Sequence, residues 1–313
     1  MSKKLFLGAA LGALLAVGAS VPSRADETYI PLISKGFQHQ FWQAVKLGAE
    51  QAAKDANVKI TFEGPETEAM VDKQIDMLSA ALAKKPNAIG FAALDSKAAI
   101  PLLKKAQAGK IPVIAFDSGV DSDIPLTTCT TDNVAAAGLA ADKMAGAIGD
   151  AGEVAVVVHD QTSRTGIDRR DGFLNQMKAK HPNVKVVDVQ YGGGDHLKSA
   201  EIAKTMLQAH PNLKGIFGAN EGSAEGVAIG VKESGKKVVI VGYDSGKEQK
   251  DAIRSGAMLG AITQNPIGIG KCTVEQAVKA LKGETLPKVV DTGFYYYDKT
   301  NIDDPKIAAV LYD

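Results

Sequence analysis

The sequence predicts an α/β protein with two similar lobes, each built on a parallel β-sheet covered by helices. Short apolar runs rich in Val and Ile alternate with segments of helical spacing, and this unit returns roughly every 25–30 residues. The chain has 313 residues, which is long for a single core. Two sheets of about five or six strands each therefore fit the sequence better than one large sheet.

The predicted strands are continuous apolar runs, as expected of strands that are buried on both faces. They lie at 28–34, 59–63, 88–94, 111–117, 153–160, 184–190, 213–220, 238–244 and 259–265. Helical spacing follows them, for example in 41–56 and 70–85, and Gly or Pro residues end these helices. The segment 121–133 has no clear helix and is interpreted as a crossing between lobes, with a boundary near 130. The last residues also lack the repeat and are expected to cross back.

Residues 1–25 have the features of a secretory signal peptide. Lys3 and Lys4 precede an apolar run that is too short to span a bilayer, and Ser23 and Ala25 occupy the positions that a signal peptidase reads. We expect cleavage after Ala25 and export of the mature protein; an uncleaved membrane anchor is the alternative. Cleavage leaves 33 basic against 36 acidic residues, a balance that disfavours nucleic acid as a partner.

The two cysteines are expected to be buried free thiols. Cys129 lies in a strand-like run and Cys272 in a helix-like one, and both have small or apolar neighbours. A disulfide is the alternative that remains open to an exported protein.

Polar side chains collect where the predicted strands end. In open α/β sheets, ligands bind outside the carboxyl ends of the strands. The residues at these ends are Asp95, Asp117, His159, Asp160, Asn220, Glu221, Asp244, Gln264 and Asn265, with Arg169 on the helix after the fifth strand. Phe41 and Trp42 follow the first strand. Carboxylates and amides suit adjacent hydroxyls and aromatic rings suit C–H faces, so we expect a pocket for a small hydroxyl-rich molecule. Helix N-capping is the alternative role for each Asp or Asn alone.

No catalytic motif competes with this interpretation. The five histidines show no HExxH or paired metal-ligand spacing. The segment 222–226 resembles a nucleophile elbow only superficially, because Ser223 begins a helix and has no evident His partner. The glycines at 192–194 lack the context of a phosphate-binding loop and indicate a flexible turn. We therefore expect no enzyme activity, no metal and no cofactor.

The motifs as a set resemble the periplasmic sugar-binding proteins of bacterial ABC importers, of the type I ribose/galactose-binding kind. The matching motifs are the aromatic pair after the first strand, IPVxxxD, TDN, RxxGF, GIFGANE, VVIVGYD and AITQNP, in order from about residue 28 to 285. The resemblance implies two Rossmann-like lobes joined by a three-segment hinge. One lobe would comprise 26–130 plus 265–292, and the other 131–264 plus 293–313.

The resemblance also implies a set of sugar-binding residues. Phe41 and Trp42 match an aromatic pair that sandwiches a pyranose, and Arg169 matches an arginine that binds ring or hydroxyl oxygens. The remaining matches are Asp117, Asn220, Asp244 and Gln264, with His39 where ribose-type members carry an Asn. Lys35 joins this set if it points inward. Ser118 and Ala92 depart from the ribose-type pattern, which favours a larger hexose, a polyol or an amino sugar.

The function implied is a monomeric periplasmic receptor that captures a monosaccharide and delivers it to the permease of an ABC transporter. The alternative is a sugar-sensing subunit for a chemoreceptor or sensor kinase. A sugar-processing enzyme would need a poised general acid and base, whereas the carboxylates here look like hydroxyl ligands. A DNA-binding regulator is disfavoured because the export signal occupies the N-terminus.

Overall fold

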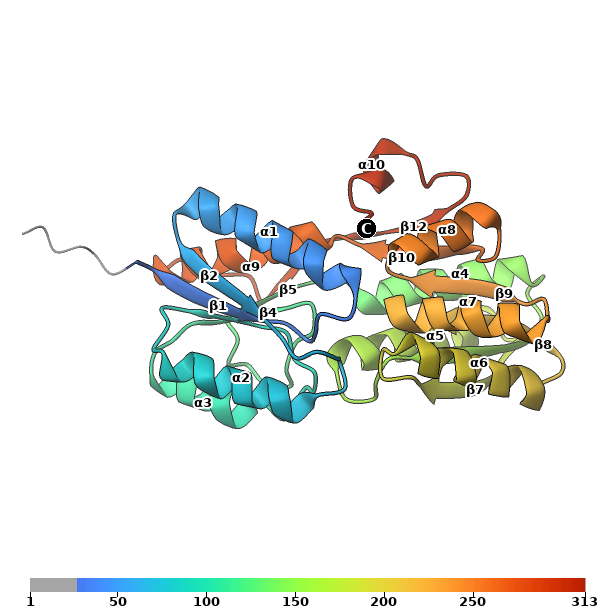
Figure 1. Ribbon diagram of the computed structural model, residues 1–313, viewed down its shortest axis with the longest axis horizontal. Coiled ribbons are helices and arrows are strands. Elements are labelled where there is room, and N and C mark those ends of the chain that lie inside the picture. The colour runs from blue at the N-terminus through green and yellow to red at the C-terminus, as the bar shows by residue number, and fades with distance from the viewer. Residues whose placement is uncertain (1–26, 313) are drawn as a thin grey trace, which may run out of the picture.

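Apolar runs at nearly regular spacing form two six-stranded sheets, one in each of two lobes that lie end to end (Figure 1). The computed structural model describes residues 27–312, so the expected signal peptide lies outside the described residues. The first sheet has the order β11-β5-β4-β3-β1-β2, and the second has the order β12-β10-β9-β8-β6-β7. All strand pairs are parallel except β10 with β12. The predicted α/β class with two lobes is confirmed.

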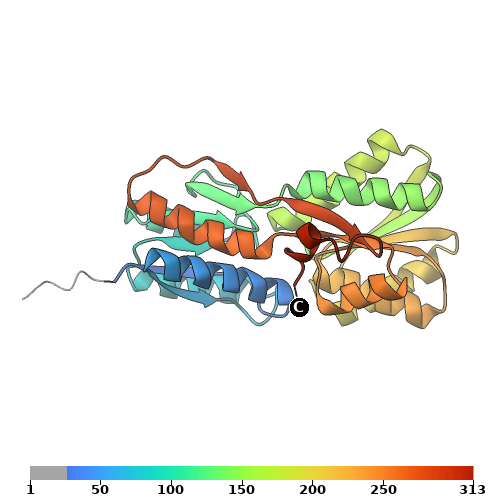
Figure 2. The same cartoon turned by 90° about the horizontal axis from the view of Figure 1, so that it is seen from above.

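The first lobe contains the first sheet and four helices. Its strands are β1 (Tyr29–Ile33), β2 (Lys59–Glu63), β3 (Ile89–Phe91), β4 (Val113–Phe116), β5 (Thr127–Thr130) and β11 (Val289–Asp291). Its helices are α1 (Gln40–Ala56), α2 (Val71–Ala83), α3 (Ile100–Ala108) and α9 (Pro266–Leu281). Helices α1 and α9 lie side by side (Figure 2). Gly270 permits this contact, because a Cβ there would lie 1.9 Å from the carbonyl oxygen of Val45.

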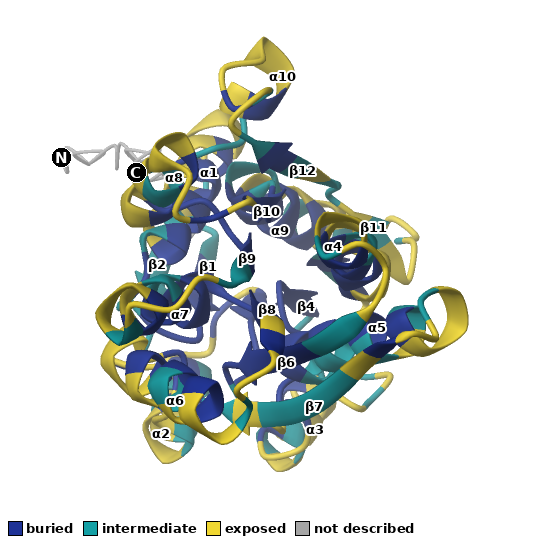
Figure 3. Ribbon diagram, turned by 90° about the vertical axis from the view of Figure 1, so that its right-hand side faces the viewer, coloured by how far each residue is buried: buried dark blue, intermediate teal, exposed yellow. Residues whose placement is uncertain are grey.

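The second lobe contains the second sheet and the other helices. Its strands are β6 (Gly152–Val158), β7 (Val184–Tyr191), β8 (Leu213–Gly218), β9 (Val239–Tyr243), β10 (Gly260–Gln264) and β12 (Phe294–Asp298). Its helices are α4 (Asn133–Ala147), α5 (Arg164–Lys180), α6 (His196–Ala209), α7 (Glu221–Ser234), α8 (Lys247–Ser255) and α10 (Pro305–Ala308). Most strands are buried between helices whose outer faces are exposed (Figure 3).

The chain passes between the lobes at three adjacent places: after β5, between β10 and α9, and between β11 and β12. The backbone N–H of Thr292 donates to the carbonyl oxygen of Thr130 at 2.9 Å, and the amide nitrogen of Asn265 donates to the carbonyl oxygen of Thr292 at 3.3 Å. The three crossings are therefore hydrogen-bonded to one another. Strand β5 lies within the segment 121–133, which was interpreted as a crossing between lobes, and it contains Cys129, which was placed in a strand-like run.

The expectation of free thiols was wrong. Cys129 of β5 and Cys272 of α9 form a disulfide, with their Cα atoms 6.0 Å apart, inside the usual range for such bonds. The two residues are 143 positions apart, and they meet because α9 returns to the first lobe after β10 and packs across β5. Apolar neighbours are compatible with either a thiol or a disulfide, so the local sequence could not distinguish them.

Within residues 27–312, no helix combines the length and the apolar character that crossing a membrane would require. No cluster of three or more His, Cys, Asp or Glu side chains in the same range is arranged to hold a metal ion.

Candidate functional site

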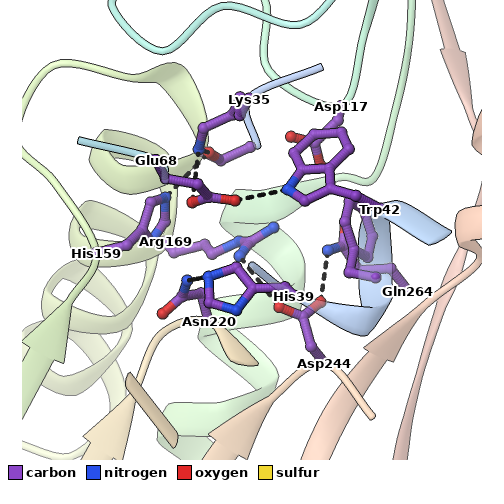
Figure 4. A pocket seen from close by; sticks show the side chains of 12 residues that line it. Lys35, His39, Trp42, Glu68, Asp117, His159, Arg169, Asn220, Asp244 and Gln264 are labelled. Carbon is purple, nitrogen blue, oxygen red and sulfur yellow. Dashed lines mark hydrogen bonds and ion pairs between the residues drawn. The ribbon is translucent and has the colours of Figure 1, made fainter. Parts of the chain in front are cut away.

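The carboxyl ends of strands from both sheets meet at one cavity between the lobes, with about 250 Å³ of space not occupied by atoms (Figure 4). Its lining residues are Lys35, His39, Phe41, Trp42, Glu68, Asp117, His159, Thr165, Arg169, Asn220, Asp244 and Gln264. All nine residues that the sequence selected are among these twelve. Asp95 and Asn265 do not line the cavity; their side chains accept backbone hydrogen bonds in a turn and at the start of α9, as the capping alternative predicts.

Arg169 is fixed by its own lobe. It lies in the second turn of α5 and is 3% exposed. Its Nε donates to Asn133 Oδ1 at 2.8 Å, its Nη1 donates to the carbonyl oxygen of Ala219 at 3.0 Å, and its guanidinium lies 3.8 Å from the ring centroid of Tyr243. Asp244 Oδ2 lies 3.9 Å from Nη1. These contacts hold a buried cation at the wall of the cavity, suitably placed to donate to ligand oxygens.

Asp244 is also held within the second lobe. Its Oδ1 accepts a hydrogen bond from Gln264 Nε2 at 2.7 Å, and its Oδ2 accepts one from the backbone N–H of Glu221 at 3.0 Å. Gln264 is oriented in turn by Thr131, whose hydroxyl donates to Gln264 Oε1 at 2.8 Å. Burial raises the pKa of Asp244, while Arg169 and these hydrogen bonds oppose the rise. The result is a polar wall whose members orient one another.

Asp117 and Asp244 occupy equivalent turns in the two lobes. They follow β4 and β9, with φ values of 55° and 78°. The N–H of Asp117 donates to the carbonyl oxygen of Cys129 at 2.8 Å, and that of Asp244 donates to the carbonyl oxygen of Ile262 at 2.6 Å. Asp tolerates this left-handed conformation better than most residues, and such turns are frequent at binding sites. Burial raises the pKa of Asp117 to about 6, although Lys35 and Arg169 lower it.

The first lobe supplies a charged pair beside an aromatic ring. Trp42 Nε1 donates to Glu68 Oε1 at 2.7 Å, and Lys35 Nζ lies 3.6 Å from Glu68 Oε2 (Figure 4). Burial raises the pKa of Glu68, but Lys35, followed by His39, His159 and the hydrogen bond from Trp42, outweighs burial and brings the pKa to about 2. Lys35 also reaches the second lobe, where it lies 3.8 Å from Asp160 Oδ2 and donates to Thr165 Oγ1 at 3.2 Å. Lys35 therefore lines the cavity with its charge balanced by carboxylates.

The aromatic pair does not form a sandwich. The ring centroids of Phe41 and Trp42 are 4.9 Å apart and the rings are inclined at 82°. This is an edge-to-face contact that leaves no space for a sugar between the two rings. The expectation that they flank a pyranose on opposite faces was therefore wrong, because adjacent residues at the start of α1 pack against each other. Both rings contribute to a single wall.

His39 and Asn220 face each other across the lobes. His39 Nε2 lies 3.0 Å from Gln38 Nε2 and 3.5 Å from Asn220 Nδ2. Burial lowers the pKa of His39. The neutral ring can accept a hydrogen bond from one of these amides through Nε2. Asn220 also caps α7, because its Oδ1 accepts from the N–H of Ser223 at 2.9 Å. Asn220 therefore both caps α7 and lines the cavity.

Glu221 connects the lobes directly beside the cavity. Its carboxylate accepts hydrogen bonds from the backbone N–H groups of Gln40 at 2.8 Å and Phe41 at 3.1 Å, and from the Tyr312 hydroxyl at 3.2 Å. A residue of α7 therefore caps the N-terminus of α1 in the other lobe. Burial, followed by Asp244 and Glu225, raises the pKa of Glu221 to about 8. The two lobes are in contact and close the cavity.

Three lining residues were not selected from the sequence as part of the site. Glu68 lies in the loop after β2, beyond the end of that strand at Glu63, so a survey of strand ends does not reach it. His159 directly follows β6 and was noted at a strand end but not assigned a role. Thr165 lies in the first turn of α5, where a helix start gives no signal for a pocket.

Known proteins resemble this chain over most of its length. Residues 30–285 match the family described as the periplasmic binding protein domain. The D-allose-binding periplasmic protein of Escherichia coli is 29% identical over 91% of this chain and 93% of its own length. A carbohydrate transporter solute-binding protein from Agrobacterium radiobacter, solved with D-arabinose, superimposes with a TM-score of 0.88 at 34% identity, covering 92% of this chain and 99% of its own. An ABC transporter solute-binding protein from Agrobacterium vitis, solved with D-fucose, gives 0.88 at 33%, covering 91% and 100%.

The family match spans well over half of the chain and agrees with the two-lobed architecture and the interlobe cavity. This chain belongs to the periplasmic binding protein family.

Proposed function

We propose that this protein is a periplasmic receptor that captures a monosaccharide between its lobes and delivers it to the membrane permease of an ABC transporter. The observation that carries the proposal is the cavity itself, in which planar polar side chains from both lobes surround a small space beside an aromatic wall. Relatives that are solved with D-arabinose and D-fucose support a sugar as the ligand. The names of the relatives describe import and transport, which favours delivery to a permease over service as a sensor subunit.

The size and charge of the cavity define the ligand class. The space of about 250 Å³ that atoms leave free in the cavity is small, so a single sugar ring fits better than an oligosaccharide. Two cations, Lys35 and Arg169, face three carboxylates, from Glu68, Asp117 and Asp244. A neutral hexose or polyol suits this near balance, and the extra carboxylate also suits an amino sugar. The nine residues selected from the sequence are proposed as sugar contacts.

Closure of the lobes is the proposed mechanism of capture. We assign 26–130 plus 265–292 to one moving body and 131–264 plus 293–313 to the other, with bending at the three crossings. Each lobe contributes part of the site, so only the closed form makes all contacts at once, and a sugar shifts the population toward it. The protein acts as an exported monomer that needs no cofactor and binds no nucleic acid.

Isothermal titration calorimetry with D-allose, D-arabinose, D-fucose, D-galactose, D-ribose and D-tagatose tests the proposal. We expect at least one sugar to bind, and we expect Trp42→Ala and Asp244→Ala each to weaken that binding by more than about tenfold. Tyr295→Ala and Asp123→Ala are matched controls, because they remove an exposed ring and an exposed carboxylate. Binding of no sugar by the folded wild type, or equal affinity in all four variants, would contradict the proposal.

A further inference from the structure

His159 has a ring nitrogen whose hydrogen-bonding capacity is unused. The residue directly follows β6, lines the cavity and is 1% exposed. Within residues 27–312, six buried side-chain polar atoms have no hydrogen-bond partner, and His159 Nδ1 is the one that belongs to a cavity-lining residue. A buried polar group without a partner is costly, so such an atom in a residue that lines a binding cavity is a candidate for a contact that the ligand completes.

The other ring nitrogen is already engaged by the second lobe. His159 Nε2 lies 3.1 Å from Thr165 Oγ1, 3.5 Å from Ser163 Oγ and 3.6 Å from Asp160 Oδ2. The Ser163 hydroxyl donates to Asp160 Oδ2 at 2.7 Å, and Thr165 Oγ1 accepts from Lys35 Nζ at 3.2 Å. This network fixes the plane of the imidazole, because Nε2 contacts Thr165, and Thr165 is in turn held by Lys35. Nδ1 is left as the free side of a rigid ring.

The ring is neutral in this setting. Burial, followed by the charge of Lys35, lowers the pKa of His159 to about 3, although Asp160 opposes the shift. A neutral imidazole has one donor and one acceptor nitrogen. If Thr165 donates to Nε2, Nδ1 carries the proton and donates; if Nε2 donates to Thr165, Nδ1 accepts. A hydroxyl group can pair with Nδ1 in either case, whereas a carboxylate or an ammonium group can pair in only one.

We propose that His159 is a further specificity-determining residue of the proposed receptor, and that its Nδ1 hydrogen-bonds one hydroxyl group of the bound sugar. This inference rests on the proposed function. It predicts that the receptor discriminates against the analogue that lacks this one hydroxyl, because that analogue leaves Nδ1 buried without a partner. Thr165 and Lys35 act as positioning residues for the ring.

Two substitutions separate a ligand contact from a structural role. In His159→Asn, the side-chain amide places a polar atom close to the position of Nδ1 and removes Nε2, whereas His159→Gln keeps a polar atom near Nε2 and removes Nδ1. The parent sugar is the one that the wild type binds most tightly in the titrations above. We expect His159→Gln to weaken its binding by about tenfold and His159→Asn to retain most of it. The reverse order would show a purely structural role and would overturn the proposal.

Deoxy analogues of the parent sugar identify the contact. We expect one of its monodeoxy forms to bind the wild type about tenfold more weakly than the parent, and this difference to vanish in His159→Gln. The proposal would be overturned if, for every analogue, the loss of affinity relative to the parent sugar were the same in the wild type and in His159→Gln. Absence of any sugar binding to the wild type would instead count against the proposed function.

A measurement on the wild type covers the case in which a variant fails to fold. Nitrogen-15 spectra of protein labelled at histidine resolve the Nδ1 and Nε2 signals of a neutral imidazole. We expect the Nδ1 signal of His159 to shift on addition of the parent sugar while its Nε2 signal changes little. An unchanged Nδ1 signal at saturation would overturn the proposal.

Discussion

The two walls of the cavity are held in place in different ways. In the second lobe, Arg169 is fixed by Asn133 and Ala219, and Asp244 is fixed by Gln264, all within that lobe. In the first lobe, Lys35 reaches across to Thr165. The N-terminus of α1, which carries Phe41 and Trp42, is capped from across the cavity by Glu221.

This difference implies an order of events. The hydrogen bonds that hold Arg169 and Asp244 join groups of the second lobe only, so the proposed opening of the lobes would leave them intact. In the first lobe, the contact of Lys35 with Thr165 and the cap of α1 by Glu221 would form only when the lobes meet. A sugar should therefore bind first to the preorganised second lobe, and closure should then add the aromatic wall.

The largest expected effect comes from removing the disulfide, which lies in the first lobe. The double variant Cys129→Ser, Cys272→Ser should lower the free energy of unfolding of the first lobe by about 2 to 5 kcal/mol. Trp42 is the single tryptophan of the chain, so its fluorescence reports urea unfolding of that lobe. We expect the urea concentration at the midpoint of the fluorescence transition to fall. The later part of the circular-dichroism transition, which reports the second lobe, should keep its midpoint. An unchanged fluorescence midpoint would show that the disulfide does not stabilise this lobe.

The second test removes the cation of the preorganised wall. Arg169→Met leaves Asp244 buried without its positive partner, and breaking a buried pair costs about 3 to 5 kcal/mol. Sugar affinity measured by calorimetry should fall by more than about a hundredfold. Arg170→Met is the matched control, because Arg170 lies on the same helix and pairs with Asp171 outside the cavity. Similar losses in both variants would contradict the special role of the second lobe.

The third test concerns the link between the lobes. The pKa of Glu221 is about 8 in the closed form, and we expect it near its ordinary value of 4.5 when the lobes separate, so closure takes up a proton. The resulting stabilisation is complete below the ordinary value and is lost as the pH rises through about 8. Sugar affinity should therefore fall by about tenfold between pH 7 and pH 9.

Glu221→Gln should flatten this dependence, because an amide keeps an acceptor for the N–H groups of α1 without titrating. Glu233→Gln, at the exposed end of the same helix, should keep the wild-type profile. Parallel pH profiles for wild type and Glu221→Gln would exclude Glu221 as the source of the effect.

The sequence predicted the strand-end residues of the site more successfully than it predicted their interactions. Asp117, Asn220, Asp244 and Gln264 were found because parallel strands direct their carboxyl ends to one edge of a sheet, a property of local pattern. Glu68 was missed because it lies in a loop that carries no periodic signal. The edge-to-face packing of Phe41 on Trp42 and the pairing of Cys129 with Cys272 depend on tertiary contacts, which spacing along the chain does not encode.

The smallest test examines a surface contact of the second lobe that lies far from the cavity. Hydrogen bonding to Asp142 raises the pKa of His181, despite slight burial, and Asp150 contributes further; the two carboxylates lie 2.9 and 2.6 Å from its ring nitrogens. This stabilisation is fully present below the ordinary value of 6.5 and is lost as the pH rises through the higher value of the folded state. The contact joins the end of α5 to α4, so it belongs to the second lobe alone. Raising the pH from 6 to 8 should slightly lower the urea midpoint of the late circular-dichroism transition in the wild type, but not in His181→Gln. Sugar affinity should be equal in the two proteins at each pH. A change in the early fluorescence midpoint instead would mean that the lobes do not unfold independently, and the contrast between them would then describe contacts in the closed form only.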